Sequence, residues 1–173
     1  MTAKEFHRQV TGDQSEFLDR FLDLLARLKI DYCVIDGLAA NAYVEPVVTL
    51  DCDIVVVAPR LPELEKELRA QFKVEPFAHS LNVSAPGSDV RVQIQTDARY
   101  QSFLPRRQPR AVLGRELPVA AIEDLLQGKL WAYQDATRRA TKRQKDLVDI
   151  ARLLEIQPAL AAQVPDEVRR KLL

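Results

Sequence analysis

A short apolar run that begins with two aspartates constrains the fold of this chain more than any other segment. Residues 50–57 read LDCDIVVV, with an unbroken apolar series after the second aspartate, Asp53. Successive side chains of a strand point to opposite faces of a sheet, so this strand needs apolar contacts on both faces. The run therefore predicts a central strand in a sheet that is covered on both sides.

Helical and strand patterns alternate around this run. Residues 14–30 place apolar side chains at helical spacing opposite acids and arginines, which is typical of an amphipathic helix. Residues 89–96 alternate instead, with Val90, Val92 and Ile94 on one face and polar side chains on the other. In chain order we expect a helix over 14–30, a strand over 32–35, a short helix over 38–44, a strand over 50–57, a helix over 61–72, a strand over 89–96, short extended pieces over 111–113 and 116–119, and helices over about 120–134, over 138–155 and from 158 onward.

This order is α/β first and all-α last. We expect the α/β (α+β) class, with a small mixed sheet flanked by helices and followed by a C-terminal helical part. A chain of 173 residues is long enough for one globular domain with its own core. The predicted division places the α/β core in residues 1–118 and the helical part, packed on that core, in residues 119–173.

Charge and hydropathy limit the partners that the chain can have. The 25 Lys and Arg residues balance the 25 Asp and Glu residues, so no global basic field holds nucleic acid, and any such contact must be local. No apolar run approaches the roughly 18 residues of a membrane span, and the N-terminal sequence MTAKEFHRQV contains no signal-peptide core. We therefore expect no membrane association and a cytoplasmic location.

The cysteines and histidines are not arranged as metal ligands. Cys33 and Cys52 each lie in an apolar, strand-like run, which indicates small core residues in a reducing compartment and not a disulfide. His7 and His79 are isolated, and we interpret them as surface or capping residues. A zinc site is not expected, because such sites require clustered histidines and cysteines.

The two aspartates are the main candidates for chemistry. Asp51 and Asp53 are one residue apart, so both carboxylates project from the same face of the strand while Cys52 points to the other. Neighbouring carboxylates repel each other and are costly to bury without a positive partner. Oxygen ligands suit Mg²⁺ or Mn²⁺, so the pair predicts a divalent cation site. The alternative is two exposed turn acids ahead of a strand.

The context of these aspartates resembles the nucleotidyltransferase superfamily of the DNA polymerase β type. In that superfamily, as in this chain, a strand is followed by a glycine at the start of a short helix, and Asp-x-Asp begins the next strand. The glycine of this chain is Gly37. The resemblance implies that the nucleotide phosphates of an NTP bind at Gly37 and Leu38, and that Asp51 and Asp53 hold Mg²⁺ (or Mn²⁺) and act in catalysis. This chain departs from the family at Leu38, where a serine or a second glycine is usual.

The sequence LLQGKLWAYQDATRRATKRQKDLVDIARLLE, residues 125–155, is similar to the signature of the abortive-infection toxin-like branch of minimal nucleotidyltransferases. In that branch a helix with a lysine is followed by a basic segment and a Lys-Asp-x-x-Asp-Ile/Leu helix. The resemblance implies that the lysine and the basic segment contact the nucleotide. The matching residues are Lys129, Arg143, Lys145, Asp146 and Asp149.

The helical pattern alone leaves other roles open for these charged residues. Lys129 interrupts the apolar face of its helix, so it points inward and requires an anion. A nucleotide phosphate or a structural pair with Asp146 would satisfy it, and the side chain could also snorkel to water. Lys145 and Asp149 are spaced for a surface ion pair. The basic run over 138–145 could attract a phosphate-bearing substrate or form a solvated face.

A further departure concerns the third carboxylate that active members of the superfamily generally carry on a neighbouring strand. Gln93, in the run RVQIQ, stands where that aspartate is expected, and we count it as a catalytic-site candidate. An amide oxygen can coordinate a metal, but an amide cannot act as a general base. Asp89 and Asp97 flank the strand, each about 13 Å from Gln93 along an extended chain, so neither is an easy substitute.

The resemblance implies a metal-dependent nucleotidyltransferase that binds Mg–NTP and transfers a nucleotidyl group to an RNA, protein or small-molecule hydroxyl, with release of pyrophosphate. The departures at Leu38 and Gln93 support an alternative, a catalytically weakened nucleotide- or metal-binding module that acts as a regulator or toxin–antitoxin component. A metal-dependent glycosyltransferase that uses Asp-x-Asp for a sugar nucleotide is less favoured, because those folds normally need a longer α/β chain.

Overall fold

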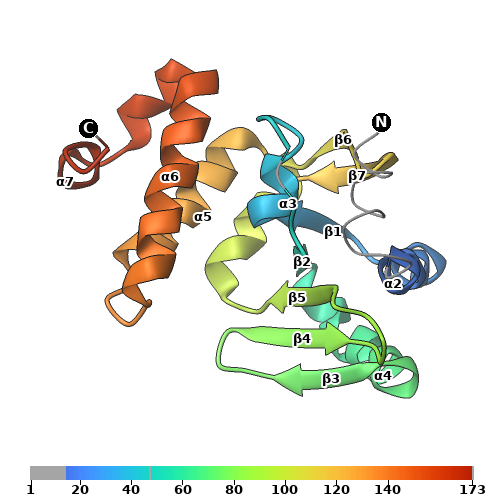
Figure 1. Ribbon diagram of the computed structural model, residues 1–173. Coiled ribbons are helices and arrows are strands. Elements are labelled where there is room, and N and C mark those ends of the chain that lie inside the picture. Colours follow the sequence, from blue (N-terminus) through green and yellow to red (C-terminus); the bar gives the residue numbers. More distant parts are fainter. Residues whose placement is uncertain (1–14, 47, 173) are drawn as a thin grey trace.

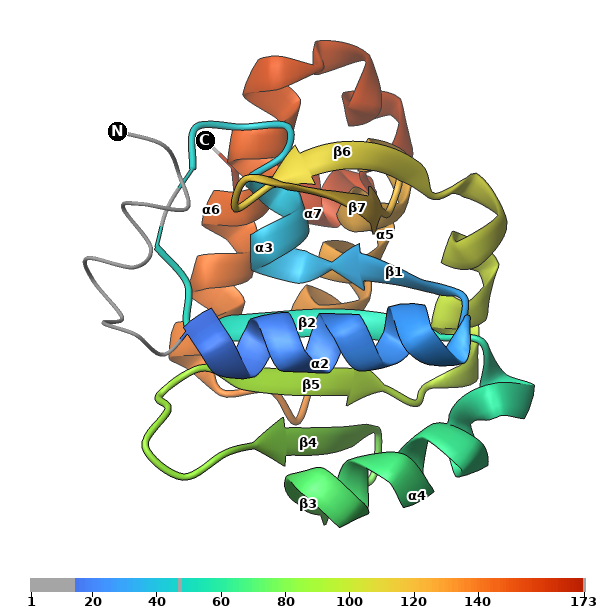
Figure 2. The same cartoon turned by 90° about the vertical axis from the view of Figure 1, so that its right-hand side faces the viewer.

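The computed structural model describes residues 15–46 and 48–172, so the expectation for His7 lies outside the described residues. Within them the chain forms a seven-stranded mixed sheet with helices on both faces (Figures 1 and 2). The predicted α/β class, with a mixed sheet flanked by helices, is confirmed. Among the described helices, none is long and apolar enough to cross a membrane.

The sheet has the strand order β3-β4-β5-β2-β1-β7-β6. Strand β2 runs parallel to β5 and antiparallel to β1, while β1 runs parallel to β7. The pairs β3–β4 and β6–β7 at the two edges are antiparallel. The strands are β1 Tyr32–Ile35, β2 Asp51–Val56, β3 Lys73–Pro76, β4 Ser80–Ser84, β5 Arg91–Gln95, β6 Gln108–Val112 and β7 Arg115–Val119.

Strand β2 lies in the middle of the sheet, where its sequence predicts it. Ile54 and Val55, which point to opposite faces, are both 0% exposed. Figure 2 shows helices on one face of the sheet in front and the C-terminal helices behind it. The front helices are α2 Ser15–Leu28 and α4 Leu61–Gln71, and those behind are α3 Asp36–Ala40, α5 Ile122–Gln134 and α6 Ala140–Ile156.

The β3–β4 hairpin lies in a stretch for which the sequence predicts no strand. Strand β3 is short and largely exposed and ends at Pro76, so it lacks the apolar alternation that identifies a strand. In β4, Leu81 and Val83 are buried and supply the apolar face that packs on the core. The hairpin extends the sheet beyond β5, and its residue Ser80 lines the cavity described below.

Other differences concern short helical turns. Residues Ala98–Arg106 form a 3-10 helix, and the segment after Gln157 forms a second 3-10 helix, Pro158–Gln163, followed by α7, Asp166–Arg169. One hydrophobic cluster contains core residues from both sides of residue 118, and the proposed division at that point stays a prediction. Cys33 and Cys52 are buried and free.

A row of paired residues crosses the middle of the sheet. Ile35 on β1 pairs with Asp53 on β2, Asp53 pairs with Gln93 on β5, and Gln93 pairs with Asn82 on β4. Paired residues on neighbouring strands project from the same face. The sheet therefore places Asp53 between the end of β1 and Gln93.

Candidate functional site

A cavity of about 160 Å³ lies where the central strands meet the 3-10 helix Ala98–Arg106 and helix α5. Its lining comes from segments that are far apart in the sequence, because the C-terminal helices pack across the face of the sheet from which Asp53 projects. The polar residues of the lining that matter most here are Asp36, Asp53, Gln93, Tyr100, Lys129 and Arg138.

Asp53 is a carboxylate in this cavity without a positive partner. Its side chain forms no ion pair or hydrogen bond with any described residue. Burial, followed by the negative charges of Asp36 and Asp51, raises the pKa of Asp53 well above its usual range, while Lys129 and Lys145 act in the opposite direction. The free protein therefore holds Asp53 in surroundings that disfavour its ionised form.

Asp51 lies on the same face of β2 as Asp53, as the spacing predicts, but it stands outside the cavity lining. Its strand partner on β5 is Arg91, whose Nε lies 3.2 Å from Asp51 Oδ1. That oxygen is buried and makes no hydrogen bond. Arg91 is 60% exposed in its side chain, and a pair of this kind is screened by water and contributes little to stability.

Gln93 lines the cavity next to Asp53, its partner across β2 and β5. The position expected for a third carboxylate is therefore adjacent to the candidate metal ligand, and it carries an amide. Asp97 cannot replace it, because its carboxylate pairs with Arg99 at 2.9 Å and caps the following 3-10 helix. Hydrogen bonding to Arg99 lowers the pKa of Asp97.

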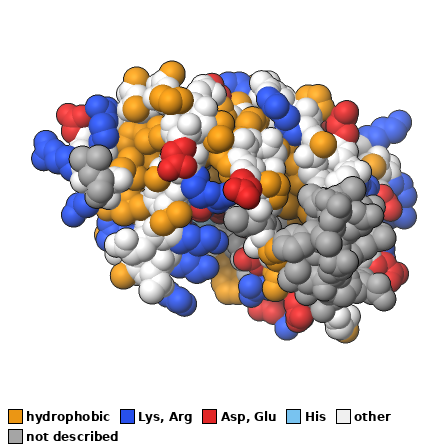
Figure 3. Space-filling view, turned by 45° about the horizontal axis from the view of Figure 1, so that its top comes forward, with side chains coloured by type: hydrophobic (Ala, Val, Ile, Leu, Met, Phe, Trp, Pro, Cys, Tyr) orange, Lys and Arg blue, Asp and Glu red, His pale blue; other side chains and the backbone are white. Residues whose placement is uncertain are grey.

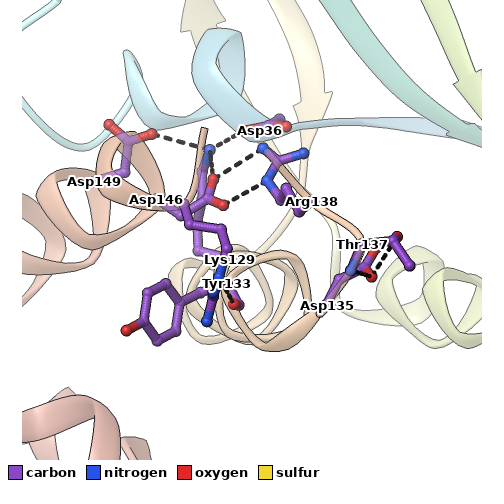
Figure 4. A network of polar contacts seen from close by, with 9 residues as sticks. Asp36, Lys129, Tyr133, Asp135, Thr137, Arg138, Asp146 and Asp149 are labelled. Atoms are coloured by element: carbon purple, nitrogen blue, oxygen red, sulfur yellow. Dashed lines mark hydrogen bonds and ion pairs between the residues drawn. The ribbon is translucent and has the colours of Figure 1, made fainter. Parts of the chain in front are cut away.

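Lys129 points into the protein and is bound by carboxylates, as Figure 4 shows. Its Nζ contacts Asp36, lies 2.9 Å from Asp149 Oδ2 and lies 3.6 Å from Asp146 Oδ1. Burial tends to lower the pKa of Lys129, but the charges of Asp36 and Asp149 raise it above its usual range. The structural pair with Asp146 that the sequence left open is thus present, and two further aspartates join it.

Asp36 is the site residue that sequence reasoning missed. It is the first residue of α3, lines the cavity and contacts Lys129. Burial opposes its ionisation, but the charge and hydrogen bond of Lys129 lower its pKa below the usual range. The signal available in the sequence was its place between the predicted strand over 32–35 and Gly37.

Arg138 completes this network at the turn between α5 and α6. Its Nε and Nη2 donate hydrogen bonds to the two carboxylate oxygens of Asp146 at 2.6 and 3.0 Å. Asp146 is 0% exposed. A fully buried carboxylate needs its partners, so Arg138 and Lys129 together hold Asp146 and fix α6 against α5.

The other basic residues that the motif predicts lie apart from the cavity lining. Arg143 donates a hydrogen bond to the carbonyl oxygen of Tyr133 at 2.9 Å and stacks on its ring, 4.9 Å from the ring centre. Lys145 is exposed, but its positive charge reaches Asp53. The surface pair of Lys145 with Asp149, one of the roles that the sequence left open, is not formed, because Asp149 pairs with Lys129 and Arg152.

Gly37 and Leu38 lie in the first turn of α3. The Leu38 side chain is 2% exposed and belongs to the core, so only its backbone can face a ligand. At Gly37 a Cβ atom would meet Thr49 Oγ1 at 4.0 Å, which is ordinary contact. Packing therefore does not require a glycine at this position.

An aromatic wall closes the cavity on the side of α5. The Tyr100 ring packs edge-on against Phe103 and Trp131, with ring centres 5.1 and 5.2 Å apart. Gly128 lies close to this wall, since a Cβ atom there would be 3.4 Å from Tyr100 Cε1. Burial raises the pKa of Tyr100 to about 12.

The carboxylates fit a magnesium ion only as a partial ligand set. Asp51 Oδ1 is buried, makes no hydrogen bond with a described residue and has only the ion pair with Arg91, and Asp53 forms no ion pair within the described part of the chain, so both carboxylates could turn lone pairs toward a metal. The described residues contain no group of three or more His, Cys, Asp or Glu side chains that could hold a metal ion. Mg²⁺ is commonly bound by one or two carboxylates and completes its coordination with water and substrate phosphates.

One face of the molecule mixes both charges. On the face shown in Figure 3, the Lys and Arg side chains of the described residues are interspersed with acidic and apolar ones. On this face a nucleic-acid partner would meet local basic groups and not a continuous basic surface.

The model of one protein family, described as nucleotidyl transferase AbiEii toxin of a type IV toxin–antitoxin system, matches residues 12–173. The chain belongs to this AbiEii family. Membership confirms the nucleotidyltransferase superfamily and the abortive-infection branch that the two sequence motifs resemble. It also supports nucleotidyl transfer and a toxin–antitoxin role. No curated protein sequence matches the chain.

Solved structures show that this AbiEii-family chain has the nucleotidyltransferase fold. It is similar to ANT(2″)-Ia in complex with adenylyl-2″-tobramycin, at 14% identity and a TM-score of 0.64, over 92% of this chain and 99% of that one. It is also similar to lincomycin-bound lincosamide antibiotic adenylyltransferase LnuA, at 15% identity and a TM-score of 0.57, over 85% and 98%. An antigenic nucleotidyltransferase-like protein from Paracoccidioides brasiliensis matches at 23% identity and a TM-score of 0.55, over 94% and 91%.

Proposed function

We propose that this AbiEii-family protein binds a magnesium–NTP complex in the cavity and transfers its nucleotidyl group to an acceptor hydroxyl. The observation that carries the proposal is the state of Asp53, a cavity carboxylate without a cation, next to an oxygen of Asp51 without a hydrogen bond. Two such carboxylates repel each other in the free protein, and a divalent cation between them would remove that penalty.

The residues have separate roles in this proposal. Asp51 and Asp53 would hold Mg²⁺ (or Mn²⁺), with the amide oxygen of Gln93 as a neutral ligand beside them. A divalent cation held there would supply positive charge to the phosphates. Lys129 and the backbone at Gly37 would bind the remaining phosphate oxygens, with Arg143 and Lys145 adding positive charge outside the cavity lining.

The transfer step is an in-line displacement. The acceptor oxygen bonds to the α-phosphorus, the bond to the β-phosphate oxygen breaks, and pyrophosphate leaves with the electron pair. The acceptor proton passes to solvent, because the amide of Gln93 cannot accept it. A positioned base is typically worth about 10²–10⁴ in rate, so we expect slow transfer.

A catalytically weakened binding module is the second candidate. It is favoured by Gln93 and by the pairing of the cations in the cavity lining, since Lys129 contacts three aspartates and Arg138 holds Asp146. In this case the protein would bind Mg–NTP and regulate a toxin–antitoxin partner without chemistry.

The acceptor and cellular setting are part of the proposal. RNA, protein and small-molecule hydroxyls all fit the chemistry, and the basic segment 138–145 gives a phosphate-bearing acceptor a local contact beside the cavity. We place the protein in the cytoplasm, where NTPs and Mg²⁺ are available.

Incubation with each labelled NTP, Mg²⁺ and total RNA or cell protein separates the two candidates. The enzyme predicts label on an acceptor, lost in Asp53→Asn. The binding module predicts retention of NTP without transfer. Failure of the wild-type protein to bind any Mg–NTP would contradict both.

A further inference from the structure

The cavity side of Lys129 is covered by the carboxylate of Asp36. Both residues line the cavity, and an ion pair joins them (Figure 4). Asp146 and Asp149 contact Lys129 from helix α6 and lie outside the cavity lining. Lys129 thus contacts two aspartates of α6 on the side away from the cavity and Asp36 on the cavity side. We call this contact of Asp36 the cap.

This cap and an incoming phosphate would compete for the same ammonium group. A phosphate oxygen that approaches Lys129 from the cavity meets Asp36, a like charge, at the position where it would bind. Like charges that face each other in a site oppose binding strongly, and the opposition is larger in a partly buried site than in water.

A residue without a side chain could adopt the backbone conformation of Asp36. Its φ angle is +60°, in the left-handed region that glycine adopts freely and that most other residues avoid. A glycine would keep this backbone at no steric cost. Lys129 would also keep two carboxylates, Asp146 and Asp149, if Asp36 were replaced.

We propose that Asp36 is an affinity-determining residue whose carboxylate occupies the phosphate position on Lys129, and that nucleotide must displace it to bind. The identity of the ligand rests on the proposed function, but competition for Lys129 can be tested without a nucleotide. Inorganic tripolyphosphate carries the same phosphate charge and has no base or sugar.

Two variants test the cap. Asp36→Asn keeps the size of the side chain and tolerates the left-handed backbone, and Asp36→Gly removes the side chain with no strain. Calorimetric titration with tripolyphosphate in the absence of metal should show at least about tenfold tighter binding in both variants than in the wild type. Asp135→Asn is the matched control, because it removes one negative charge at the α5–α6 turn outside the cavity lining, and it should bind as the wild type does.

Thermal melts accompany the titrations, and we expect both Asp36 variants to unfold cooperatively near the wild-type temperature. If folded Asp36→Asn and Asp36→Gly bind tripolyphosphate no more tightly than the wild type, the inference is overturned. Parallel titrations with Mg–ATP keep the two proposals apart. Tighter binding of tripolyphosphate by the Asp36 variants supports the cap even if no variant binds Mg–ATP. Mg–ATP binding that is unchanged in Asp53→Asn contradicts the proposed function and leaves the cap intact.

Discussion

Asp53 on β2 and Gln93 on β5 are paired across parallel strands and line the same cavity. One carries a carboxylate without a cation and the other a neutral amide. Gln93 therefore occupies the position next to the candidate metal ligand. Its amide is neutral, so it cannot supply the negative charge and the proton acceptor that a carboxylate would supply there.

We expect Gln93→Asp to raise nucleotidyl transfer. The new carboxylate would stand beside Asp53 and supply a ligand and a base at once, and a well-placed base is typically worth about 10²–10⁴ in rate. Transfer of label from NTP to an acceptor measures the effect. Gln95→Asp is the control, because it adds the same charge two positions along β5 in the cavity lining. High activity in the wild type that Gln93→Asp abolishes would mean that the third position is assigned to the wrong residue.

We expect Lys129→Met to destabilise the protein strongly. Lys129 is 8% exposed and contacts three aspartates, and the variant would leave Asp146 with Arg138 alone and Asp149 without its closest cation. Removing one partner of a buried ion pair typically costs about 3–5 kcal/mol in the free energy of unfolding, which chemical denaturation measures. Lys145→Met, at an exposed position of α6, should stay within about 0.5 kcal/mol of the wild type. Equal stabilities for the two variants would show that the Lys129 network adds nothing to the fold.

We expect Gly37→Ala to separate binding from stability. Its Cβ would have room, and its φ lies outside the left-handed region, so alanine should raise the free energy of unfolding by about 0.4–1 kcal/mol. If the backbone at Gly37 approaches a phosphate, Mg–ATP binding should weaken in the same variant. Gly87→Ala gives the contrast, since φ is +79° there and alanine should cost about 1–2 kcal/mol without affecting binding. Unchanged Mg–ATP affinity in Gly37→Ala would remove Gly37 from the site.

Periodicity identified the central strand and the main helices because their patterns are strong. The run after Asp53 is apolar at every position and is buried on both faces, and the amphipathic pattern of 14–30 becomes α2. The β3–β4 hairpin was missed because β3 is exposed and ends in Pro76, so tertiary pairing with β5 through β4 decides its structure.

Strand alternation predicted that Asp51, Asp53 and Gln93 share a face, and the register places them so. It could not show that Asp51 lies outside the cavity, nor that Asp36 lies within it. Both facts depend on how α3 and α5 pack across the sheet. The periodicity of a single segment does not predict this packing. The three aspartates around Lys129 were hidden for the same reason, since they come from α3 and α6.

We expect Asp53→Asn to be more stable than the wild type at neutral pH without metal. The folded protein raises the pKa of Asp53, first through burial and then through Asp36 and Asp51, so its ionised form is disfavoured in the folded state. The wild type therefore loses stability as pH rises through this raised pKa and regains it as pH falls toward the unfolded value of about 3.9. The advantage of Asp53→Asn should shrink between pH 7 and pH 4 in chemical denaturation. An advantage that grows on acidification would contradict this assignment.

The most direct measurement is calorimetric titration of Mg–ATP and the other Mg–NTPs into wild type and Asp53→Asn at neutral pH, with Asp97→Asn as a control on a surface carboxylate that pairs with Arg99. Because Asp53→Asn should fold at least as well as the wild type, lost binding cannot be assigned to unfolding. The account predicts that wild type and Asp97→Asn bind at least one Mg–NTP and that Asp53→Asn does not. Equal Mg–NTP affinity in wild type and Asp53→Asn would contradict it.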